Sequence, residues 1–161
     1  MEAKSVRESM VILSHVMQPH DANPAGNIHG GVVMKLIDNA AGVVALRHSR
    51  GNVVTASIER LDFLYPVHVG NLVTLTASLN RVGRSSMEIG VRVVSENMIT
   101  GEVHHTASAY LTFVALDESG RPRPVAPLKL ESDDEIRRHE NARRRSSQRH
   151  QERNKENETA G

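Results

Sequence analysis

The sequence predicts an α+β fold in which a central α-helix is wrapped by a curved antiparallel β-sheet. Two observations lead to this prediction. An alanine-rich apolar segment, residues 32–46, follows a pair of glycines, and four segments in which apolar and polar residues alternate come after it. A helix segregated to one face of an antiparallel sheet is the architecture that this order of elements favours.

The first element that we expect is a strand at residues 6–16, where apolar residues recur without helical periodicity. A long loop follows at residues 18–29. The segment 32–46 is too long for a typical strand, and its alanines favour a helix. Because this helix is apolar on nearly every side, it must be surrounded by other elements rather than lie on a surface.

Four strands are expected next, in the segments "NVVTASIERLDFLYP", "NLVTLTASLN", "SMEIGVRVVS" and "HHTASAYLTFVAL". The turns between them, at residues 66–70, 83–85 and 97–101, are short. Short connections join antiparallel neighbours, so the sequence predicts that these four strands form a meander in chain order.

Three prolines in "DESGRPRPVAPL" end the sheet, so we expect one domain over residues 1–130 and a charged tail over residues 131–161. Ser132 and Glu135 have the spacing of a capping box and predict the start of a helix. Beyond Asn141 the tail is basic and almost without apolar residues, which indicates disorder or a solvated helix. Binding to RNA or to a membrane is the alternative, but no aromatic residues interleave with the basic ones.

The composition excludes several classes of protein. The chain of 161 residues contains no cysteine, which excludes disulfides, thiolate zinc sites and a cysteine nucleophile. A formal net charge of +1 gives no overall attraction to nucleic acid or to an anionic membrane. The N-terminus lacks the apolar region of a signal peptide, and no run of about 18 apolar residues could span a membrane, so we expect a cytoplasmic protein.

One carboxylate, Asp38, interrupts the apolar helix. An ionised and unpaired carboxylate would cost several kcal/mol to bury, so Asp38 must be protonated, must be paired or must face a polar cleft. Lys35 stands three residues earlier and offers a surface ion pair, which is the structural interpretation. The helix has no broad polar face for such a pair, so the functional alternative is a general base in a crevice between elements or subunits.

The loop before the helix supplies groups that a general base would need. Gly30 and Gly31 allow close approach of the backbone to a ligand, and free N–H groups at a helix start stabilise a developing oxyanion. Asn23 could add an amide donor, although an Asx-turn that organises the loop is its structural interpretation. His29 is expected to shape the Gly-Gly loop, with direct contact to a substrate as the lesser alternative.

These residues belong to a longer recognisable pattern. The core "DAN..GN.HGG..MK..D..AG..A.RH" resembles the hotdog-fold acyl-CoA thioesterases of the cytosolic long-chain (brain-type) acyl-CoA hydrolase family. The similarity extends over roughly residues 8–127 and includes "SMEI", "SEN", "TG" and "GRP.PVAPL". The resemblance implies a hotdog fold, that is, a helix wrapped by a curved antiparallel sheet.

The resemblance also implies an assembly. Two hotdog protomers pair edge to edge, the active sites lie at the dimer interface, and the catalytic Asn and Asp of the family, which correspond to Asn23 and Asp38, come from opposing protomers. Animal relatives fuse two hotdog domains and split the working pair between them. This chain carries both residues in one domain, so a homodimer would hold two equivalent sites, and a trimer of such dimers is expected.

The reaction implied is hydrolysis of a fatty acyl-CoA to a free acid and coenzyme A, without a cofactor. Asp38 would act as general base, or less favourably as a nucleophile that forms a mixed anhydride, while Asn23, Gly30 and Gly31 orient water or hold the thioester oxygen. The turn formed by Arg84, Ser85 and Ser86 is the best candidate for binding coenzyme A; it could equally be structural, and Arg81 and residues 55–57 are weaker choices.

Other functions remain as alternatives. No HExxH motif occurs, and the adjacent His104 and His105 would point to opposite faces of a strand, so no metal site is expected. The main alternative is a non-catalytic hotdog module that binds acyl-CoA and reports it to a partner, because a fold alone does not decide function. A hotdog hydratase is a third possibility, but it would require a histidine paired with an acid in the cleft.

Overall fold

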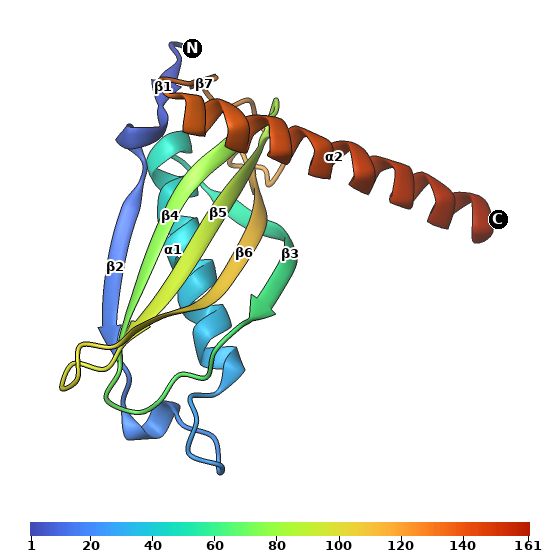
Figure 1. Ribbon diagram of the computed structural model, residues 1–161. Coiled ribbons are helices and arrows are strands. Elements are labelled where there is room, and N and C mark those ends of the chain that lie inside the picture. Colours follow the sequence, from blue (N-terminus) through green and yellow to red (C-terminus); the bar gives the residue numbers. More distant parts are fainter.

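Helix α1, Gly30–Ser49, lies in the hollow of a curved five-stranded antiparallel sheet (Figure 1). This computed structural model describes residues 1–161. The predicted α+β hotdog fold is therefore confirmed. The residues of α1 that it buries are Val33, Ile37, Ala40, Ala41, Val44, Ala45 and His48.

The sheet has the spatial order β2-β4-β5-β6-β3. Its strands are β2 Val11–Val16, β3 Val53–Phe63, β4 Leu72–Val82, β5 Ser86–Glu96 and β6 Val103–Ala115. Two short strands, β1 Lys4–Ser5 and β7 Leu128–Lys129, pair in parallel beside it, and single 3-10 turns occur at Val6–Glu8 and Pro19–Asp21. The strand predicted at residues 6–16 is thus confirmed only from Val11, because the chain first makes the turn that buries Val6.

The predicted four-strand meander is wrong for its first strand. Strands β4, β5 and β6 follow one another as expected, but β3 pairs with β6 and not with β4, whose free side is taken by β2. The connection at residues 64–71 makes this crossing possible, because it passes across the end of the sheet near the start of α1. Ile28 in the loop before α1 donates its N–H to the carbonyl of Val67 at 2.8 Å and fixes that path.

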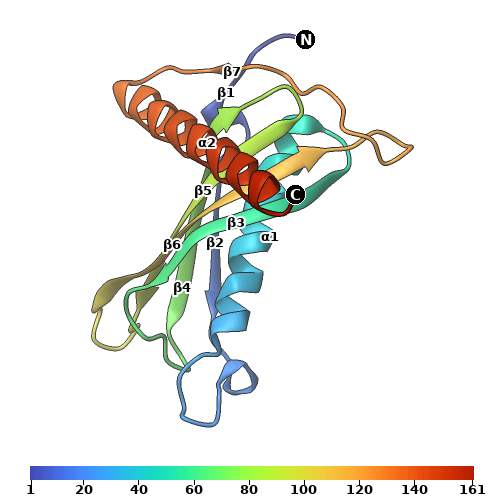
Figure 2. The same ribbon diagram turned by 90° about the vertical axis from the view of Figure 1, so that its right-hand side faces the viewer.

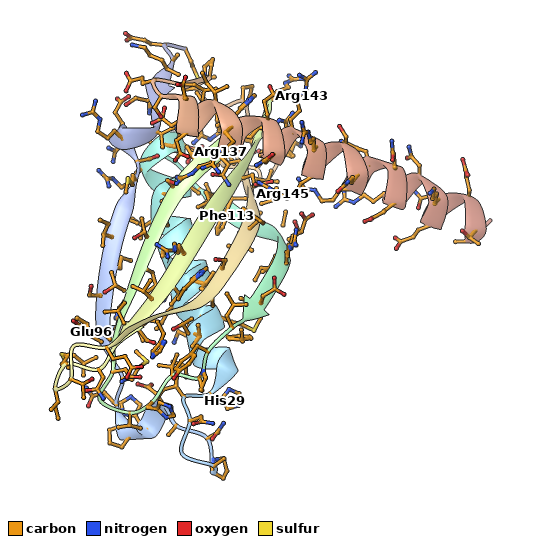
Figure 3. All side chains as sticks on the ribbon, in the orientation of Figure 1. His29, Glu96, Phe113, Arg137, Arg143 and Arg145 are labelled. Atoms are coloured by element: carbon orange, nitrogen blue, oxygen red, sulfur yellow. The ribbon has the colours of Figure 1, made fainter.

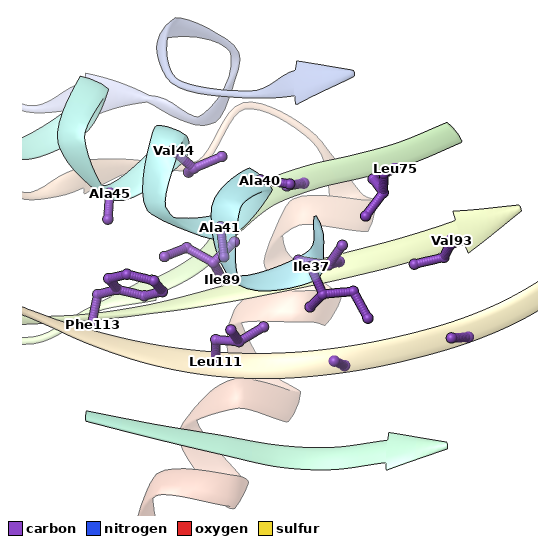
Figure 4. Packing of buried hydrophobic residues seen from close by; sticks show 14 of the residues in the cluster. Ile37, Ala40, Ala41, Val44, Ala45, Leu75, Ile89, Val93, Leu111 and Phe113 are labelled. Atoms are coloured by element: carbon purple, nitrogen blue, oxygen red, sulfur yellow. The ribbon is translucent and has the colours of Figure 1, made fainter. Parts of the chain in front are cut away.

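Apolar side chains fill the space between α1 and the sheet (Figure 4). Leu75, Ile89 and Leu111 of the sheet are completely buried, and each such side chain contributes about 1.5–3 kcal/mol on burial. The small side chains of Ala40 and Ala41 let the strands approach the helix closely. Register shifts in β3, β4 and β6 mark irregularities of the kind that bend a strand, and they explain how the sheet curves around α1.

One irregularity in β3 decides which side chains face the helix. Thr55 lies opposite Phe113 on the inner face, whereas Ser57 lies opposite Thr112 on the outer face, because Ala56 is an extra residue between them. Without this bulge, the two hydroxyl residues would share one face, as simple alternation predicts. The bulge therefore gives β3 a polar group on each side of the sheet.

Helix α2, Asp133–Thr159, crosses the outer face of the sheet, on the side away from α1, and its C-terminal part projects beyond β3 (Figures 1 and 2). Its start agrees with the predicted cap: Ser132 Oγ accepts a hydrogen bond from the N–H of Glu135 at 3.2 Å. Ala142 is buried against the sheet, while every residue from His150 onward is exposed. No helix of the chain is long and apolar enough to cross a membrane.

The C-terminal end of α1 is held by a buried histidine. His48 is 1% exposed, and its Nε2 donates to the carbonyl of Ala126 at 2.8 Å. Its Nδ1 is buried without a protein partner. Burial, with a contribution from the charge of Lys4, lowers the pKa of His48 below its usual value of 6.5, although the hydrogen bond to Ala126 acts in the opposite direction. His48 is therefore neutral in the folded chain at neutral pH.

This lowered pKa predicts a loss of stability in acid. The unfolded chain takes up a proton at His48 near pH 6.5, before the folded chain does, so the free energy of unfolding should fall as the pH drops below that value. His48→Gln keeps a donor for Ala126 but cannot titrate, so its urea-unfolding free energy should depend less on pH between about 7 and 5 than that of the unmodified chain. Equal pH dependence of the two proteins would contradict the assignment.

Candidate functional site

Asp38 lies on the side of α1 that faces β3, at the free edge of the sheet. Its carboxylate is half-buried, and its Oδ1 accepts a hydrogen bond from Thr55 Oγ1 at 2.8 Å. The ion pair with Lys35, which the sequence left open, is not formed, and no other cation pairs with Asp38. The only protein partner of this acid is thus a hydroxyl group that the β3 bulge turns to the inner face.

Exposed apolar side chains surround Asp38. On α1, Met34 and Leu46 stand four residues before and eight residues after the acid on the same side of the helix, with exposures of 40% and 48%. On the inner face of β3, Ile58 and Phe63 are 38% and 51% exposed. Since β3 is an edge strand, its outer backbone groups are also unpaired. Asp38 therefore lies within an apolar surface that another chain or an apolar ligand could cover.

Asn23 is located elsewhere, in the loop before α1. Its Oδ1 accepts from the N–H of Ala25 at 3.0 Å, which is the Asx-turn that was its structural interpretation. Asn23 also lines a hollow of about 360 Å³ together with Gly30, Val33 and Phe63, but Asp38 does not. Asp38 is eight residues beyond Gly30 along α1, or about 12 Å at the rise of an α-helix. One protomer alone thus does not bring Asn23 and Asp38 together.

The Gly-Gly pair forms the first turn of α1. His29, at the lower end of α1 in Figure 3, is its N-cap, and Nδ1 of this histidine accepts from the N–H of Gly31 at 3.0 Å. His29 therefore shapes the helix start, as the sequence suggested, and occupies one of the two amides expected to bind an oxyanion. The N–H of Gly30 has no protein partner, and Gly30 lines the same hollow as Asn23.

The turn of Arg84, Ser85 and Ser86 is at the other end of the sheet. Its backbone is held by the N–H groups of Ala115 and Val125, which donate to the carbonyls of Ser85 and Arg84. The side chain of Arg84 is exposed. The turn is far from the Asn23 loop but nearer to Asp38.

The register and the order of the strands give the distance between the turn and the beginning of β3. Ser86 pairs with Val114, adjacent to the Phe113 that lies opposite Thr55. Two strand spacings, about 10 Å, therefore separate the beginning of β5 from the beginning of β3. The turn thus lies at the same end of the sheet as Thr55, the partner of Asp38.

Two sets of polar contacts were not anticipated from the sequence. Thr55 was only a weak candidate for binding coenzyme A, as part of residues 55–57, and its contact with Asp38 was not predicted. The second set comes from α2, where Arg145 and Arg149 contact the outer face of the sheet. Arginines at positions 145, 149 and 153, each four residues apart, were the available signal for a basic helix face.

The α2 contacts are specific. Arg145 extends from α2 (Figure 3), and its Nη2 lies 2.6 Å from Oε1 of Glu88, whose side chain is only 5% exposed. The guanidinium stands 3.6 Å from the centroid of the Tyr110 ring. Arg149 Nε lies 2.9 Å from Glu59 Oε1. A buried carboxylate requires such a partner, so Arg145 anchors α2 to the sheet.

The histidines are engaged individually. His104 stacks on Tyr65 with ring centroids 3.7 Å apart and lies 2.7 Å from Glu102, while His105 Nε2 contacts Ser108 Oγ at 2.7 Å. The structure contains no group of three or more His, Asp or Glu side chains that could hold a metal ion.

Comparison with known proteins gives consistent matches. The sequence pattern of the thioesterase superfamily matches residues 25–102. A protein of Bacillus subtilis that is named uncharacterized acyl-CoA thioester hydrolase YkhA is 39% identical over 148 residues, which cover 92% of this chain and 86% of that protein. The mouse cytosolic acyl coenzyme A thioester hydrolase is 36% identical over 146 residues, but this chain covers 89% of its own length and only 38% of the mouse protein.

Solved structures agree with these matches. A hexameric acyl-CoA thioesterase superimposes with a TM-score of 0.90 and 38% identity, covering 94% of this chain and 97% of that one. An acyl-CoA hydrolase of Staphylococcus aureus in complex with butyryl coenzyme A and coenzyme A superimposes with a TM-score of 0.88 and 33% identity, covering 98% and 96% of the two chains. That hydrolase has also been solved with alanine in place of one aspartate, one asparagine or one threonine.

Proposed function

The chain belongs to the acyl-CoA thioester hydrolases of the thioesterase superfamily, and from this membership we propose that it hydrolyses acyl-CoA to a free fatty acid and coenzyme A. One observation carries the assignment of the reaction to a site: the carboxylate of Asp38 is held by Thr55 within an exposed apolar surface. A polar group that is kept available for a reaction, and is not neutralised by a cation, is expected of a general base.

In the proposed reaction, Asp38 accepts a proton from a water molecule as the water oxygen attacks the thioester carbonyl carbon. The carbon–sulfur bond then breaks, and the departing thiolate of coenzyme A takes up a proton. Thr55 donates to one carboxylate oxygen and so fixes the direction of the other. Direct attack by Asp38 to form a mixed anhydride, which water then opens, is the less favoured alternative.

Asn23 and the amide of Gly30 are proposed to come from the second protomer of a dimer, where they hold the thioester oxygen or orient water. Three observations support this arrangement: Asn23 is distant from Asp38 within one chain, β3 has a free edge, and apolar side chains are exposed along that edge. Pairing of two β3 edges would cover the free edge of each strand and the apolar side chains exposed along it. Hexameric relatives support assembly of such dimers into a trimer of dimers.

The acyl chain is proposed to lie along the exposed apolar side chains of α1 and β3, between the protomers. Arg84, Ser85 and Ser86 are proposed to contact the coenzyme A part, because their turn lies at the end of the sheet where β3 begins and Arg84 is free to bind a phosphate. The named cytosolic relative supports a cytoplasmic location for this protein.

Replacement of Asp38 tests the reaction. Asp38→Asn keeps the shape of the side chain and removes the base, so kcat on a panel of short to long acyl-CoAs should fall by about 100-fold or more. The measurement is the release of free coenzyme A thiol. Asp133→Asn, the same change at an exposed position on α2, serves as control and should keep full activity. If the unmodified chain binds acyl-CoA but releases no thiol from any member of the panel, the protein is a binding module.

The hydroxyl of Thr55 can be tested separately from its shape. Thr55→Val removes the hydrogen bond to Asp38 with little change in volume, so kcat should fall by about tenfold, corresponding to one hydrogen bond to a charged group. Thr55→Ser retains the hydroxyl and should stay near the unmodified kcat. If Val and Ser variants lose activity equally, packing and not orientation of the carboxylate is the function of Thr55.

Mixed dimers test whether the site is shared. Asn23→Ala and Asp38→Ala chains should each be inactive, but a dimer of one with the other contains one complete site. Equal co-expression should therefore restore about a quarter of the unmodified activity, since half of the dimers are mixed and half of their sites are complete. No recovery in mixed dimers that mass spectrometry shows to have formed would place the two residues in the same protomer's site or outside it.

A further inference from the structure

A second hollow lies between α2 and the outer face of the sheet, close to the beginning of β5. Its volume is about 210 Å³, and four hydroxyl residues line it: Ser57 of β3, Ser86 of β5, Thr112 of β6 and Ser146 of α2. Neutral hydroxyl groups can donate hydrogen bonds to an anion without adding a competing negative charge. No acidic residue lines the hollow.

Three basic residues of α2 complete this hollow: Arg149, His150 and Arg153. Arg149 is fixed, because it pairs with Glu59 at 2.9 Å and donates from Nη1 to Thr112 Oγ1 at 2.6 Å. Arg153 stands one helical turn further on, is exposed, and has neither an ion pair nor a hydrogen bond within the protein. The hollow therefore presents one anchored guanidinium and one whose charge is not compensated.

This combination fits a phosphate group better than a carboxylate or a neutral ligand. Arginine offers paired donors that match the oxygens of a phosphate, and such charge-assisted hydrogen bonds are roughly twice as strong as neutral ones. A phosphate monoester or diphosphate has enough oxygens to accept from the guanidinium and from several hydroxyls at once. The anchoring of Arg149 also reduces the ordering cost that binding would otherwise carry.

The position of the hollow relates it to Asp38. Ala56, the bulge residue between Thr55 and Ser57, lines the hollow, while Thr55 holds Asp38 on the other face of the sheet. Ser86 also belongs to the turn of Arg84, Ser85 and Ser86 that is proposed to contact coenzyme A, so the turn and the hollow share this residue. We propose that this hollow binds the phosphates of the nucleotide end of coenzyme A, a proposal that rests on the proposed thioesterase function.

The other hollow under α2 is less suited to this task. It measures about 310 Å³ and is lined by Arg138 and Arg145. Arg138 pairs with Asp134 at 3.0 Å and Arg145 with Glu88, so their charges are already compensated. It also lies further from Ser86, on the side of Arg145 toward the start of α2. The unpaired Arg153 therefore favours the smaller hollow.

The test compares two substrates that differ only in the nucleotide. Acyl-CoA carries the phosphates, whereas the corresponding acyl-pantetheine has the same thioester and lacks them. Arg153→Gln should raise KM for acyl-CoA by about tenfold, the scale of one lost charge-assisted hydrogen bond, and leave kcat unchanged. Its KM for acyl-pantetheine should equal that of the unmodified enzyme. Arg153→Glu should raise KM for acyl-CoA further.

Arg144→Gln is the matched control, because it removes the same charge from an exposed position on the far side of α2 and should alter neither KM. The proposal is overturned if Arg153→Gln and Arg144→Gln have equal KM values for acyl-CoA, or if Arg153→Gln raises KM for both substrates alike. Hydrolysis of acyl-pantetheine by the unmodified chain measures thioesterase activity independently, so failure of this proposal is distinguishable from failure of the proposed function.

Calorimetry distinguishes the source of the phosphate. Adenosine 3′,5′-bisphosphate should bind the unmodified chain and compete with acyl-CoA, and Arg153→Gln should weaken its binding by the same factor as it raises KM. If inorganic diphosphate or a nucleotide binds at Arg153 without competing with acyl-CoA, the hollow serves another phosphate ligand and the assignment to coenzyme A is wrong.

Discussion

The enclosure of α1 is the constraint on which the rest of the structure depends. A helix of twenty residues with apolar side chains on almost every side has no stable place at a surface, so the sheet must curve around it. The five strands cover one side of the helix, whereas Met34, Lys35, Asn39 and Leu46 remain exposed. The apolar side chains that stay exposed on α1 have an energetic cost, and Asp38, the one carboxylate of the helix, lies among them.

The sequence predicted most of the fold because its signals were local. The alternation of residues in β4, β5 and β6 and the apolar length of α1 each depend on a single segment. Strand order does not depend on a single segment. By alternation alone β3 could pair with either β4 or β6, and in the structure β2 occupies the edge of β4, so β3 pairs with β6. The partner of Asp38 was missed for a related reason: a bulge at Ala56 is invisible in the pattern and reverses the direction of the residues that follow it, as far as the second irregularity after Glu59.

The outer face of the sheet is held by ion pairs with α2, whereas the inner face is held by apolar packing against α1. Glu88 is nearly inaccessible there and is neutralised by Arg145, a contact between residues that are 57 positions apart. No local pattern indicates such a pair, so the sequence suggested only that the tail was solvated or disordered beyond Asn141. Removing one member of a buried pair is more harmful than replacing both, so loss of Glu88 or Arg145 alone would weaken the attachment of α2, which the Arg149–Glu59 pair also supports.

The bulge at Ala56 couples the inner and the outer face of the sheet at β3. If β3 ran regularly through Ala56 without the bulge, Thr55 and Ser57 would face the same side of the sheet, and either the acid on one side or the arginine on the other would lose its hydroxyl partner. A substitution at the bulge that strengthened the contacts on one face would also change the contacts on the other face. Evolution of the acyl-binding side and of the α2 side is therefore expected to be coupled through a residue that carries no reactive group.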